Sequence, residues 1–538
     1  MGVGLGNRWA AWRSKHVRAS GSFTSQPEPR SIGIPARGAQ MKVGQFLFSG
    51  HLVEAPNTSI WDIPKSSTEF EIDIHGFHWL DHLAAEGSAD ARRLARDWVF
   101  QWGQRFGGGG GPGWQPSLAG RRLLRLINHS TMLLMGEEKS RQDAFFKLVS
   151  QQGFFLSKRA QKERPGLPRI EALAGLIHAA LSFDRQRKYL DAAMAALAKE
   201  CSSVVDETGE IPSRNAEDLM NIFTALAWVT HVVSESDLVP EREHMLAMER
   251  IVPVLRSLRL GDGGLGHFHG SGRGMEGRLD QALIDSAVRI PAAEEGGMGI
   301  HRIAQSGAVL LVDKGPQSSK YAKHFSPMAF EFSFGRVPLI VNPGPGNIFG
   351  DDWRRTSASI LAHSTSSVND ETPKLRSDKG VLLKPDVTSN RNASFAMIAA
   401  GYDAYSASHG LRSYRSLELS SDGHILRGRD VQAAETPEQQ KQFKRWQKKN
   451  RKRGIPWSIR FHLHPDIAAE VGMKGKAVTL TTKSGDVWVL TLDEASLKLE
   501  KSEYMQYGRL HPRATKQVVA TARATSYESV VNWTLRKS

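Results

Sequence analysis

Two pairs of histidines have spacings that could support chemistry. His267 and His269 lie in the glycine-rich stretch 264–270, and loops carry a disproportionate share of functional residues. His462 and His464 alternate along a predicted strand, so both side chains face one side and could share a metal ion. An ordinary loop and an ordinary strand face are the alternatives for the two pairs.

Three tyrosines, Tyr402, Tyr405 and Tyr414, are candidate proton carriers, because a phenol can donate or accept a proton during catalysis. Packing in a core or at a sheet edge is the alternative for each. Glycine-rich strings such as 270–274 do not follow a predicted strand and precede a helix. They therefore give little support to a nucleotide-binding site.

The chain is strongly basic. It has 538 residues, a formal net charge of +15 and a pI near 9.8. The positive electrostatic field of such a chain favours polyanionic binding partners: nucleic acid, acidic polysaccharide or an anionic membrane. Part of the excess lies in one run that is either a solvated basic helix or loop or a polyanion-binding patch. The run contains Lys441, Lys444, Arg445, Lys448, Lys449, Arg451, Lys452 and Arg453. No nucleic-acid-binding motif accompanies it, so nucleic acid ranks last among these partners.

Length and composition indicate a globular protein of two or three domains, with 40% apolar and 24% charged residues. No apolar run approaches the roughly 18 residues that a membrane-spanning helix needs. Cys201 is the one cysteine, so no intramolecular disulfide can form. Residues 1–45 are predicted to be a flexible leader. They carry Arg8 and Arg13 but no apolar signal-peptide core, which indicates a cytoplasmic product.

The periodicity of apolar residues changes along the chain. Up to about residue 260 they recur at helical spacing, and paired helices in series predict an α/α solenoid or toroid. The predicted helices include 170–181, 189–198, 218–233 and 241–258. After residue 290 short strand-like runs alternate with Gly/Asp/Ser turns, which predicts antiparallel sheets. These runs include 308–313, 338–341, 394–400, 413–419, 457–463, 477–482 and 487–492. We expect the two halves to meet near residue 295.

The stretch 324–365 combines several motifs in a recognisable order. It contains His324, the strand-like run 329–334, Pro338 to Gly344, Trp353-Arg354-Arg355 and Leu361 to Thr365. Upstream and downstream of it lie Ile74 to Asp81, Trp114 to Ser117 before Arg121-Arg122, Tyr414 to Leu417, and Asp422-Gly423. This order resembles the heparinase II/III family of polysaccharide lyases. The resemblance covers residues 45–535 and implies an α/α toroid packed on an antiparallel β-sandwich.

The resemblance also implies a reaction, β-elimination on an acidic sugar chain. The uronate carboxylate is neutralised, a Tyr or His removes the C5 proton, and a second group protonates the leaving oxygen. Several family residues are absent here. Leu167 to Glu171 stands where relatives often carry an Asn-His pair, and 213–218 lacks the usual tyrosine. The candidate substitutes are Arg169, Glu171, Arg214, Tyr402 and Tyr405.

A metal site is implied in the same way. The family's ligands would fall on His324, Asn342 and His363, and many relatives have Asp at the middle position. Two imidazoles and a carboxylate make a good zinc site, whereas Asn is a neutral and poorer donor. One structural zinc ion is therefore one hypothesis, and buried, hydrogen-bonded histidines are the other.

These observations predict a flexible leader (1–45), an α/α toroid (46–295) and a heparinase II/III-like β-sandwich (296–538). The predicted function is polysaccharide lyase activity on an acidic, uronate-containing polysaccharide. The alternative is a catalytically impaired protein that binds an anionic glycan. Family resemblance implies the cell envelope or periplasm, whereas the missing signal peptide favours the cytoplasm.

Overall fold

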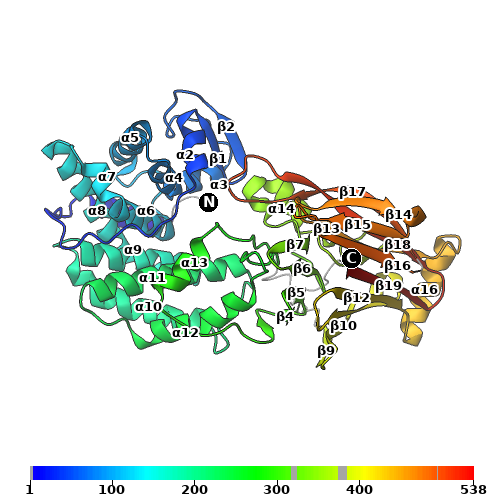
Figure 1. The fold of residues 1–538 in the computed structure, drawn as a ribbon. Helices are drawn as coiled ribbons and strands as arrows, with labels where there is room; N and C mark the ends of the chain where they lie inside the picture. Colours follow the sequence, from blue (N-terminus) through cyan, green and yellow to red (C-terminus); the bar gives the residue numbers. More distant parts are fainter. Residues whose placement is uncertain (1–3, 317–323, 374–384, 494) are drawn as a thin grey trace.

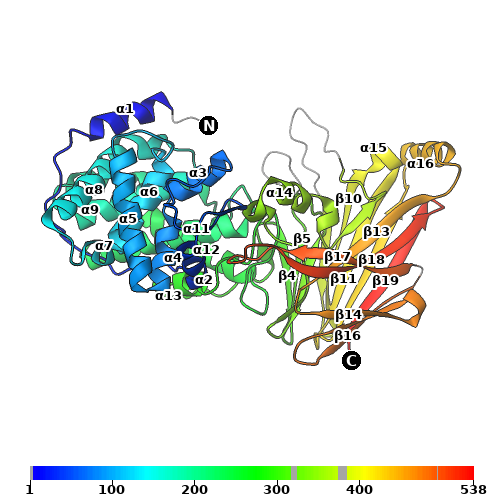
Figure 2. The same ribbon diagram turned by 90° about the horizontal axis from the view of Figure 1, so that it is seen from above.

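The computed structural model describes residues 4–316, 324–373, 385–493 and 495–538. A helical half is followed by a half built of sheets, and together they form an elongated molecule (Figures 1 and 2). The helices of the first half are α1 (Leu5–Ser14), α2 (Pro35–Lys42), α3 (Thr68–His75), α4 (His78–Glu86), α5 (Ala89–Phe106), α6 (Pro116–Asn128), α7 (Ser130–Leu134), α8 (Lys139–Arg159), α9 (Leu167–Ser182), α10 (Leu190–Val204), α11 (Ala216–Glu235), α12 (Arg242–Ser257) and α13 (Arg278–Asp285). Short 3-10 turns follow α8 (Ala160–Lys162) and precede α10 (Arg187–Tyr189).

An inner layer of helices is buried on nearly all sides. In α6, α9 and α11 most residues are buried, as expected for helices that are enclosed by others. Gly120 of α6 and Gly175 of α9 let the two backbones meet, because a Cβ at either position would collide with the facing helix. Helices α8, α10 and α12 pack outside this layer. The arrangement is the predicted α/α toroid.

The N-terminal segment differs from the predicted flexible leader. Its described part contains α1, α2 and a bridge between Phe23 and Phe183. Helix α1 packs on α8, and α2 packs on α4, where Gly38 lies against the backbone of His82. Small residues, rather than a run of large apolar ones, dock this segment on the toroid.

The second half contains two antiparallel sheets. A separate two-stranded ribbon, β1–β2, lies in the helical half. The strands are β1 (Gln45–Phe48), β2 (His51–Glu54), β3 (Gly296–Gly297), β4 (Ile300–Gln305), β5 (Ala308–Asp313), β6 (Phe330–Phe334), β7 (Val337–Val341), β8 (Ser366–Val368), β9 (Asp386–Arg391), β10 (Phe395–Tyr405), β11 (Leu411–Ser420), β12 (Ile425–Ala433), β13 (Ile455–Leu463), β14 (Ala468–Gly472), β15 (Ala477–Thr481), β16 (Val487–Leu492), β17 (Ser496–Tyr504), β18 (Arg513–Ala524) and β19 (Glu528–Lys537). Between them lie α14 (Asp351–Ser357), α15 (Ser406–His409), α16 (Pro437–Lys449) and the 3-10 turns Gly346–Phe349, Ile360–Ala362 and Met473–Gly475.

The two sheets face each other as a sandwich. One has the order β14-β15-β16-β19-β12-β11-β10-β9 and the other β17-β18-β13-β7-β6-β5-β4-β3, with β8 paired to β13. Alternate residues of β11 are buried, which is the period-two pattern of a strand with one face in a core. Phe330 stacks on Trp533 between the sheets. Arg415 and Asp430 form a fully buried ion pair beside them, with Arg415 Nε 2.7 Å from Asp430 Oδ1.

The halves share an extended apolar junction. The core of the toroid continues into Ile300, Leu311 and Ala329 of the sandwich. Arg302 of β4 donates to the carbonyl oxygens of Ser257 and Arg259 behind α12. In the opposite direction, the β17–β18 loop reaches the helical half beside β1 and α3 (Figure 1). Among the described residues, no helix is both long and apolar enough to cross a bilayer.

Candidate functional site

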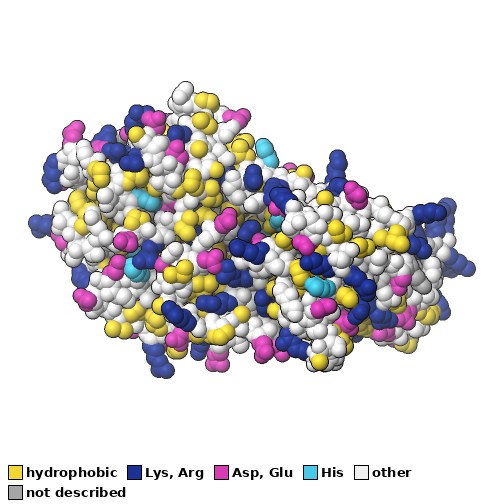
Figure 3. Space-filling view, in the orientation of Figure 1, with side chains coloured by type: hydrophobic (Ala, Val, Ile, Leu, Met, Phe, Trp, Pro, Cys, Tyr) yellow, Lys and Arg dark blue, Asp and Glu magenta, His cyan; other side chains and the backbone are white. Residues whose placement is uncertain are grey.

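A cleft of about 390 Å³ opens on the helical half, under the β17–β18 loop. Its walls come from α2, β1, α3, α4, α6, α9, α11 and the start of α13, with Tyr507 added from the sheet half. The chemistry-bearing side chains on these walls are Arg37, Asp73, His78, His82, Arg121, Arg125, Glu171, Glu217, Arg278 and Tyr507. Lysine and arginine side chains gather on this face where the two halves meet (Figure 3).

Four arginines line the cleft: Arg37, Arg121, Arg125 and Arg278. Arg121 is 2.7 Å from Glu171, and Arg125 Nε is 2.7 Å from Asp81 Oδ2. Arg278 has no hydrogen-bonded or ion-paired carboxylate within the described part of the chain, although Glu217 acts on it electrostatically. Burial, followed by the neighbouring Arg125, lowers the pKa of Arg278. This guanidinium is therefore available to an anion that enters the cleft.

A neutral imidazole faces the same arginines. Phe77 adopts a left-handed conformation (φ 63°) and starts α4 at His78, so the ring stands at a helix N-terminus, where positive charge is disfavoured. Burial, then Arg125, lowers the pKa of His78 well below its ordinary value, and Arg121 and Arg278 act in the same direction. At neutral pH the ring is uncharged and can accept a proton.

A hydrogen-bonded phenol and carboxylate stand on another wall. Asn215 caps α11 by accepting from the backbone N–H groups of Glu217 and Asp218, 2.9 Å away in each case, which fixes Glu217 in the first turn. Glu217 accepts the hydroxyl of Tyr507 and the Gly272 N–H at 3.3 Å. Burial raises the pKa of Glu217. Desolvation, followed by Glu217, raises the pKa of the Tyr507 phenol well above 10, so Tyr507 holds its proton.

The structure brings only one of the five predicted catalytic residues to this cleft. Glu171 lines it, paired with Arg121. Arg169 bonds Glu200 at 2.7 Å and the Glu163 carbonyl, and so closes the start of α9. Arg214 bonds Asp313 at 2.6 Å and the carbonyl oxygens of Met298 and Pro316 at the junction of the halves.

The other two predicted catalytic residues lie in the sandwich. Tyr402 is 1% exposed and contacts Ser366, while the Tyr405 hydroxyl donates to the Glu371 carbonyl. Burial raises the pKa of both phenols. Both side chains belong to the hydrophobic core. Neither lines the cleft.

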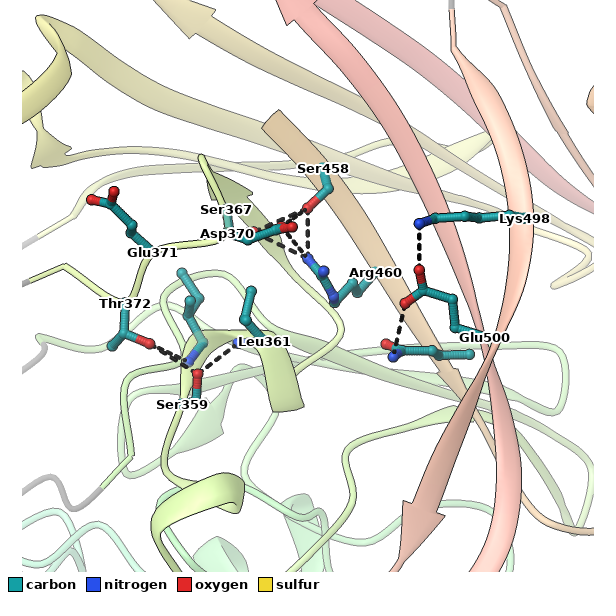
Figure 4. Close-up of polar contacts among 12 residues, drawn as sticks. Ser359, Leu361, Ser367, Asp370, Glu371, Thr372, Ser458, Arg460, Lys498 and Glu500 are labelled. Atoms are coloured by element: carbon teal, nitrogen blue, oxygen red, sulfur yellow. Dashed lines mark hydrogen bonds and ion pairs between the residues drawn. The ribbon is translucent and has the colours of Figure 1, made fainter. Parts of the chain in front are cut away.

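The three predicted metal ligands lie near one another. The rings of His324 and His363 have centroids 5.5 Å apart. Asn342 Oδ1 accepts the backbone N–H of Ser364, next to His363, at 2.9 Å. Arg460 ties the following segment to β13 through Ser367, Ser458 and Asp370 (Figure 4).

The donor set nevertheless does not fit a zinc ion. The Ser364 N–H fixes the orientation of the Asn342 amide, so the polar atom left over is the Nδ2 donor, which is buried without a partner. Two imidazoles without a third suitable donor fall short of a protein zinc site. Within the described part of the chain, no group of three His, Cys, Asp or Glu side chains could hold a metal ion. Burial, then His324, lowers the pKa of His363, whose ring nitrogens have no hydrogen-bond partner among the residues that the structure describes.

The remaining candidate histidines are bonded to neighbouring loops and strands. His267 bonds Glu331 at 3.1 Å and the Tyr504 hydroxyl at 3.2 Å. His269 Nε2 lies 3.1 Å from Asp313 Oδ2. His462 bonds Ser502 Oγ at 2.8 Å and the Leu361 carbonyl at 3.1 Å. His464 accepts from the Asp466 N–H at 3.3 Å.

The sandwich matches a known family model. Residues 289–534 match the heparinase II/III-like C-terminal domain. The second half of the chain is therefore similar to the C-terminal domain of heparinase II/III-like proteins. Solved structures of this fold include heparinase III (TM-score 0.69, 10% identity, covering 98% of this chain and 89% of that one). They also include a mutant of the heparan sulfate lyase HepC from Pedobacter heparinus (TM-score 0.59, 14% identity, covering 99% and 87%). At these identities the likeness shows the fold alone.

A relative found by sequence has a different kind of name. FtsZ-localized protein C of Caulobacter vibrioides is 25% identical over 549 aligned positions, which cover 97% of this chain and 91% of that protein. The alignment therefore spans both halves.

Three residues, His78, Arg121 and Tyr414, belong to motifs that the sequence shows. The sequence does not reveal that His78 and Arg121 line the cleft whereas Tyr414 lies outside it. His78 lies in the Ile74–Asp81 motif. Arg125, Arg278 and Tyr507 carry no sequence signal, because they are far apart in the chain and are joined only by folding. A single unaligned sequence contains no mark that would distinguish Tyr507 from other loop tyrosines.

Proposed function

We propose that this protein binds an acidic, uronate-containing polysaccharide in the cleft and cleaves it slowly by β-elimination. One observation carries the proposal: a neutral imidazole, a protonated phenol and an arginine without a bonded carboxylate line one cavity. These are His78, Tyr507 and Arg278. The match of the second half to the heparinase II/III-like C-terminal domain and the lyase-like fold support the same proposal.

Each of the three side chains has a defined part in the reaction. The Arg278 guanidinium pairs with the uronate carboxylate and stabilises the enediolate charge that develops there. His78 removes the C5 proton, and the electron pair of that bond forms the C4–C5 double bond as the C4–O bond breaks. Tyr507 donates its proton to the departing oxygen. The products are one fragment with an unsaturated uronide at its non-reducing end and one fragment with a new reducing end.

The same electrostatics explain why we expect slow turnover. Burial and three arginines depress the pKa of His78, and a weakly basic imidazole is a poor acceptor for a carbon-bound proton. A bound carboxylate would offset part of the arginine field and raise the basicity of His78. The arginines therefore lower the basicity of His78 before substrate binds. The anionic substrate weakens this effect.

The test uses the near-ultraviolet absorbance of the new conjugated double bond. The panel contains heparin, heparan sulfate, alginate, hyaluronan and bacterial uronate polymers. With an accepted polymer, we expect His78→Gln and Tyr507→Phe each to lower kcat about 10²-fold or more. His424→Gln and Tyr414→Phe are matched controls, because both residues lie on the sheet half outside the cleft. Full activity in His78→Gln would show that His78 is not the base that removes the C5 proton.

The same panel distinguishes an anionic-glycan-binding protein from an enzyme. Two of the four arginines that line the cleft are already ion-paired, to Glu171 and Asp81, and this pairing favours a binding role. Saturable binding of a polymer that is lost in Arg278→Ala, with no absorbance change, would establish the binding protein. Absence of both binding and turnover across the panel would contradict the assignment of this cleft to an acidic glycan.

A second function rests on the sequence relative. The chain is 25% identical to FtsZ-localized protein C, compared with 10% and 14% to the two lyase structures. We propose that it also associates with FtsZ, which favours the cytoplasm over the envelope or periplasm. Co-sedimentation with polymers of FtsZ from the source organism tests this. The chain should pellet only with assembled FtsZ, and recovery in the supernatant at all concentrations would contradict it.

A further inference from the structure

Helix α1 presents its large apolar side chains to solvent. Leu5 is 84% exposed, Trp9 59% and Trp12 55%. The face that packs on the toroid consists of small residues: Ala10, Ala11 and Ser14. A surface helix of a globular protein ordinarily buries its large apolar stripe and exposes its polar one. In α1 this arrangement is reversed.

The exposed residues form one continuous arc. Positions 5, 9 and 12 are separated by four and three residues, so they lie on the same side of a helix of 3.6 residues per turn. His16 continues the arc and contacts Trp12 edge-on, with ring centroids 5.6 Å apart. The arc is thus a stripe of two indoles and one leucine, which an isolated soluble chain has no reason to expose.

Contacts of the opposite face hold the helix in this orientation. Arg159 Nε of α8 donates to Asn7 Oδ1 at 2.7 Å. Lys147 Nζ donates to the carbonyl of Val17 at 2.7 Å. The Ser20 N–H donates to Ser150 Oγ at 2.8 Å. The apolar stripe stays largely exposed in this docking, so it is open to another contact.

The segment that carries the stripe has positively charged side chains and no acidic ones. Arg8, Arg13, Lys15 and Arg18 are all exposed, and no acidic residue precedes Glu28 in the sequence. The guanidinium of Arg13 lies over the Trp9 ring at 4.7 Å. Tryptophan and leucine flanked by cations are the composition of helices that lie in the interface of an anionic bilayer.

A second basic element lies on the same edge of the molecule. Figure 2 shows α1 and α16 along one long edge, and Figure 3 shows the lysine and arginine side chains at the α16 end. The cations of α16 and the turn after it are exposed: Lys441, Lys444, Arg445, Lys448, Lys449, Arg451, Lys452 and Arg453. An edge with an apolar helix at one end and a polybasic helix at the other could meet a flat anionic surface at two points.

We propose that this edge binds the surface of an anionic lipid bilayer. Helix α1 lies in the plane of the interface with Leu5, Trp9 and Trp12 among the acyl chains and its cations at the phosphates. Helix α16 adds attraction without inserting. A bilayer fits both parts, because it offers an apolar layer and a phosphate layer a few ångströms apart. A ten-residue helix alone gives marginal affinity, so binding depends on anionic lipid and weakens with salt.

The test is co-sedimentation of the full chain with vesicles of phosphatidylcholine alone or with added phosphatidylglycerol. We expect binding only with phosphatidylglycerol, and a loss of roughly ten-fold or more in affinity when Leu5, Trp9 and Trp12 are all changed to Gln. A blue shift of tryptophan fluorescence on binding should disappear in the same variant. All three positions are exposed, so circular dichroism and thermal melting should be unchanged.

Two further variants complete the design. Changing Met135, Val239 and Met473 to Gln removes three other exposed apolar side chains and should leave vesicle binding intact. Changing Lys441, Lys444 and Lys448 to Glu should weaken binding several-fold and reduce its salt dependence. Undiminished vesicle binding by the α1 variant would overturn the proposal. So would self-association that depends on α1 without vesicle binding, which would assign the stripe to a second copy of the chain.

Discussion

The two halves of the molecule place charged pairs in different surroundings. In the sandwich, Arg415 and Asp430 are both fully buried, and Asp430 also accepts the Trp533 indole N–H at 3.0 Å. In the cleft, Arg121 and Glu171 are partly exposed at the wall of a cavity. The first pair has no route to another partner and serves the fold. The second can exchange its partner for an anion that enters.

The histidines show the same contrast. His462 in the sandwich and His78 in the cleft both have lowered pKa values, and burial is the main cause in each case. Both ring nitrogens of His462 are hydrogen-bonded, whereas His78 faces the cavity. A shifted pKa alone therefore does not mark a functional residue. The shift becomes informative where the group also faces space that a ligand can fill.

Removing the sandwich carboxylate should have the largest effect on stability. Asp430→Asn leaves the Arg415 guanidinium buried without a counter-charge, and breaking a buried pair in this way costs about 3–5 kcal/mol. Chemical denaturation should report a loss of this size. Asp352→Asn is the matched control, because its ion pair with Arg355 is exposed, and its effect should stay within about 0.5 kcal/mol. Equal effects of the two changes would remove the contrast between the regions.

Acid should weaken the sandwich through its neutral histidines. The folded pKa of His462 is about 4, below the ordinary value of roughly 6.5 for an unfolded chain. The unfolded state therefore binds the proton first as the pH falls, and stability is lost between about pH 6.5 and 4. A shift of this size corresponds to about 3 kcal/mol of unfolding free energy.

His462→Gln measures this contribution. The variant should show a shallower fall of unfolding free energy between pH 7 and pH 4 than the parent chain. His424→Gln removes an exposed imidazole on the turn before β12 and controls for general effects. If the His462 variant retains the full slope, other buried groups cause the acid sensitivity.

The cleft should show the opposite response, a loss of binding without a loss of stability. Arg278→Ala removes one charge-assisted contact to an anionic ligand, worth about 1.5–3 kcal/mol, or about 10- to 100-fold in affinity for an accepted polysaccharide. Isothermal titration gives the affinity, and thermal melting should change little. Arg336→Ala, in the exposed β6–β7 turn, is the control for the general loss of positive charge. A melting shift as large as that of Asp430→Asn would show that Arg278 serves the fold.

The sequence predicts the architecture far better than the site. The helical and strand periods place α9, α11, β5 and β13 within a few residues, because each period follows from one buried face. The cleft brings together Tyr507 from a loop of the sheet half and His78 from the start of α4. No local sequence pattern links these two residues. Arg169 and Arg214 have the charge expected of site residues, but they bond elsewhere. Arg169 pairs with Glu200 at the start of α9, and Arg214 pairs with Asp313 at the junction of the two halves. Which cation meets a ligand is decided by tertiary packing.

The metal hypothesis gives the last and smallest expected effect. Asn342 stands where a carboxylate would complete the donor set, and the Ser364 N–H holds its amide with Nδ2 left over. In Asn342→Asp the Ser364 N–H can bond one carboxylate oxygen and leave the other for zinc beside His324 and His363. Without metal, the new charge is buried and should lower the melting temperature by a few degrees. Zinc should restore it in the variant, whereas zinc and chelator should leave the parent chain unchanged, and elemental analysis should find stoichiometric zinc in the variant alone. Stoichiometric zinc in the parent would show that Asn342 serves as a ligand after all, with its amide reversed.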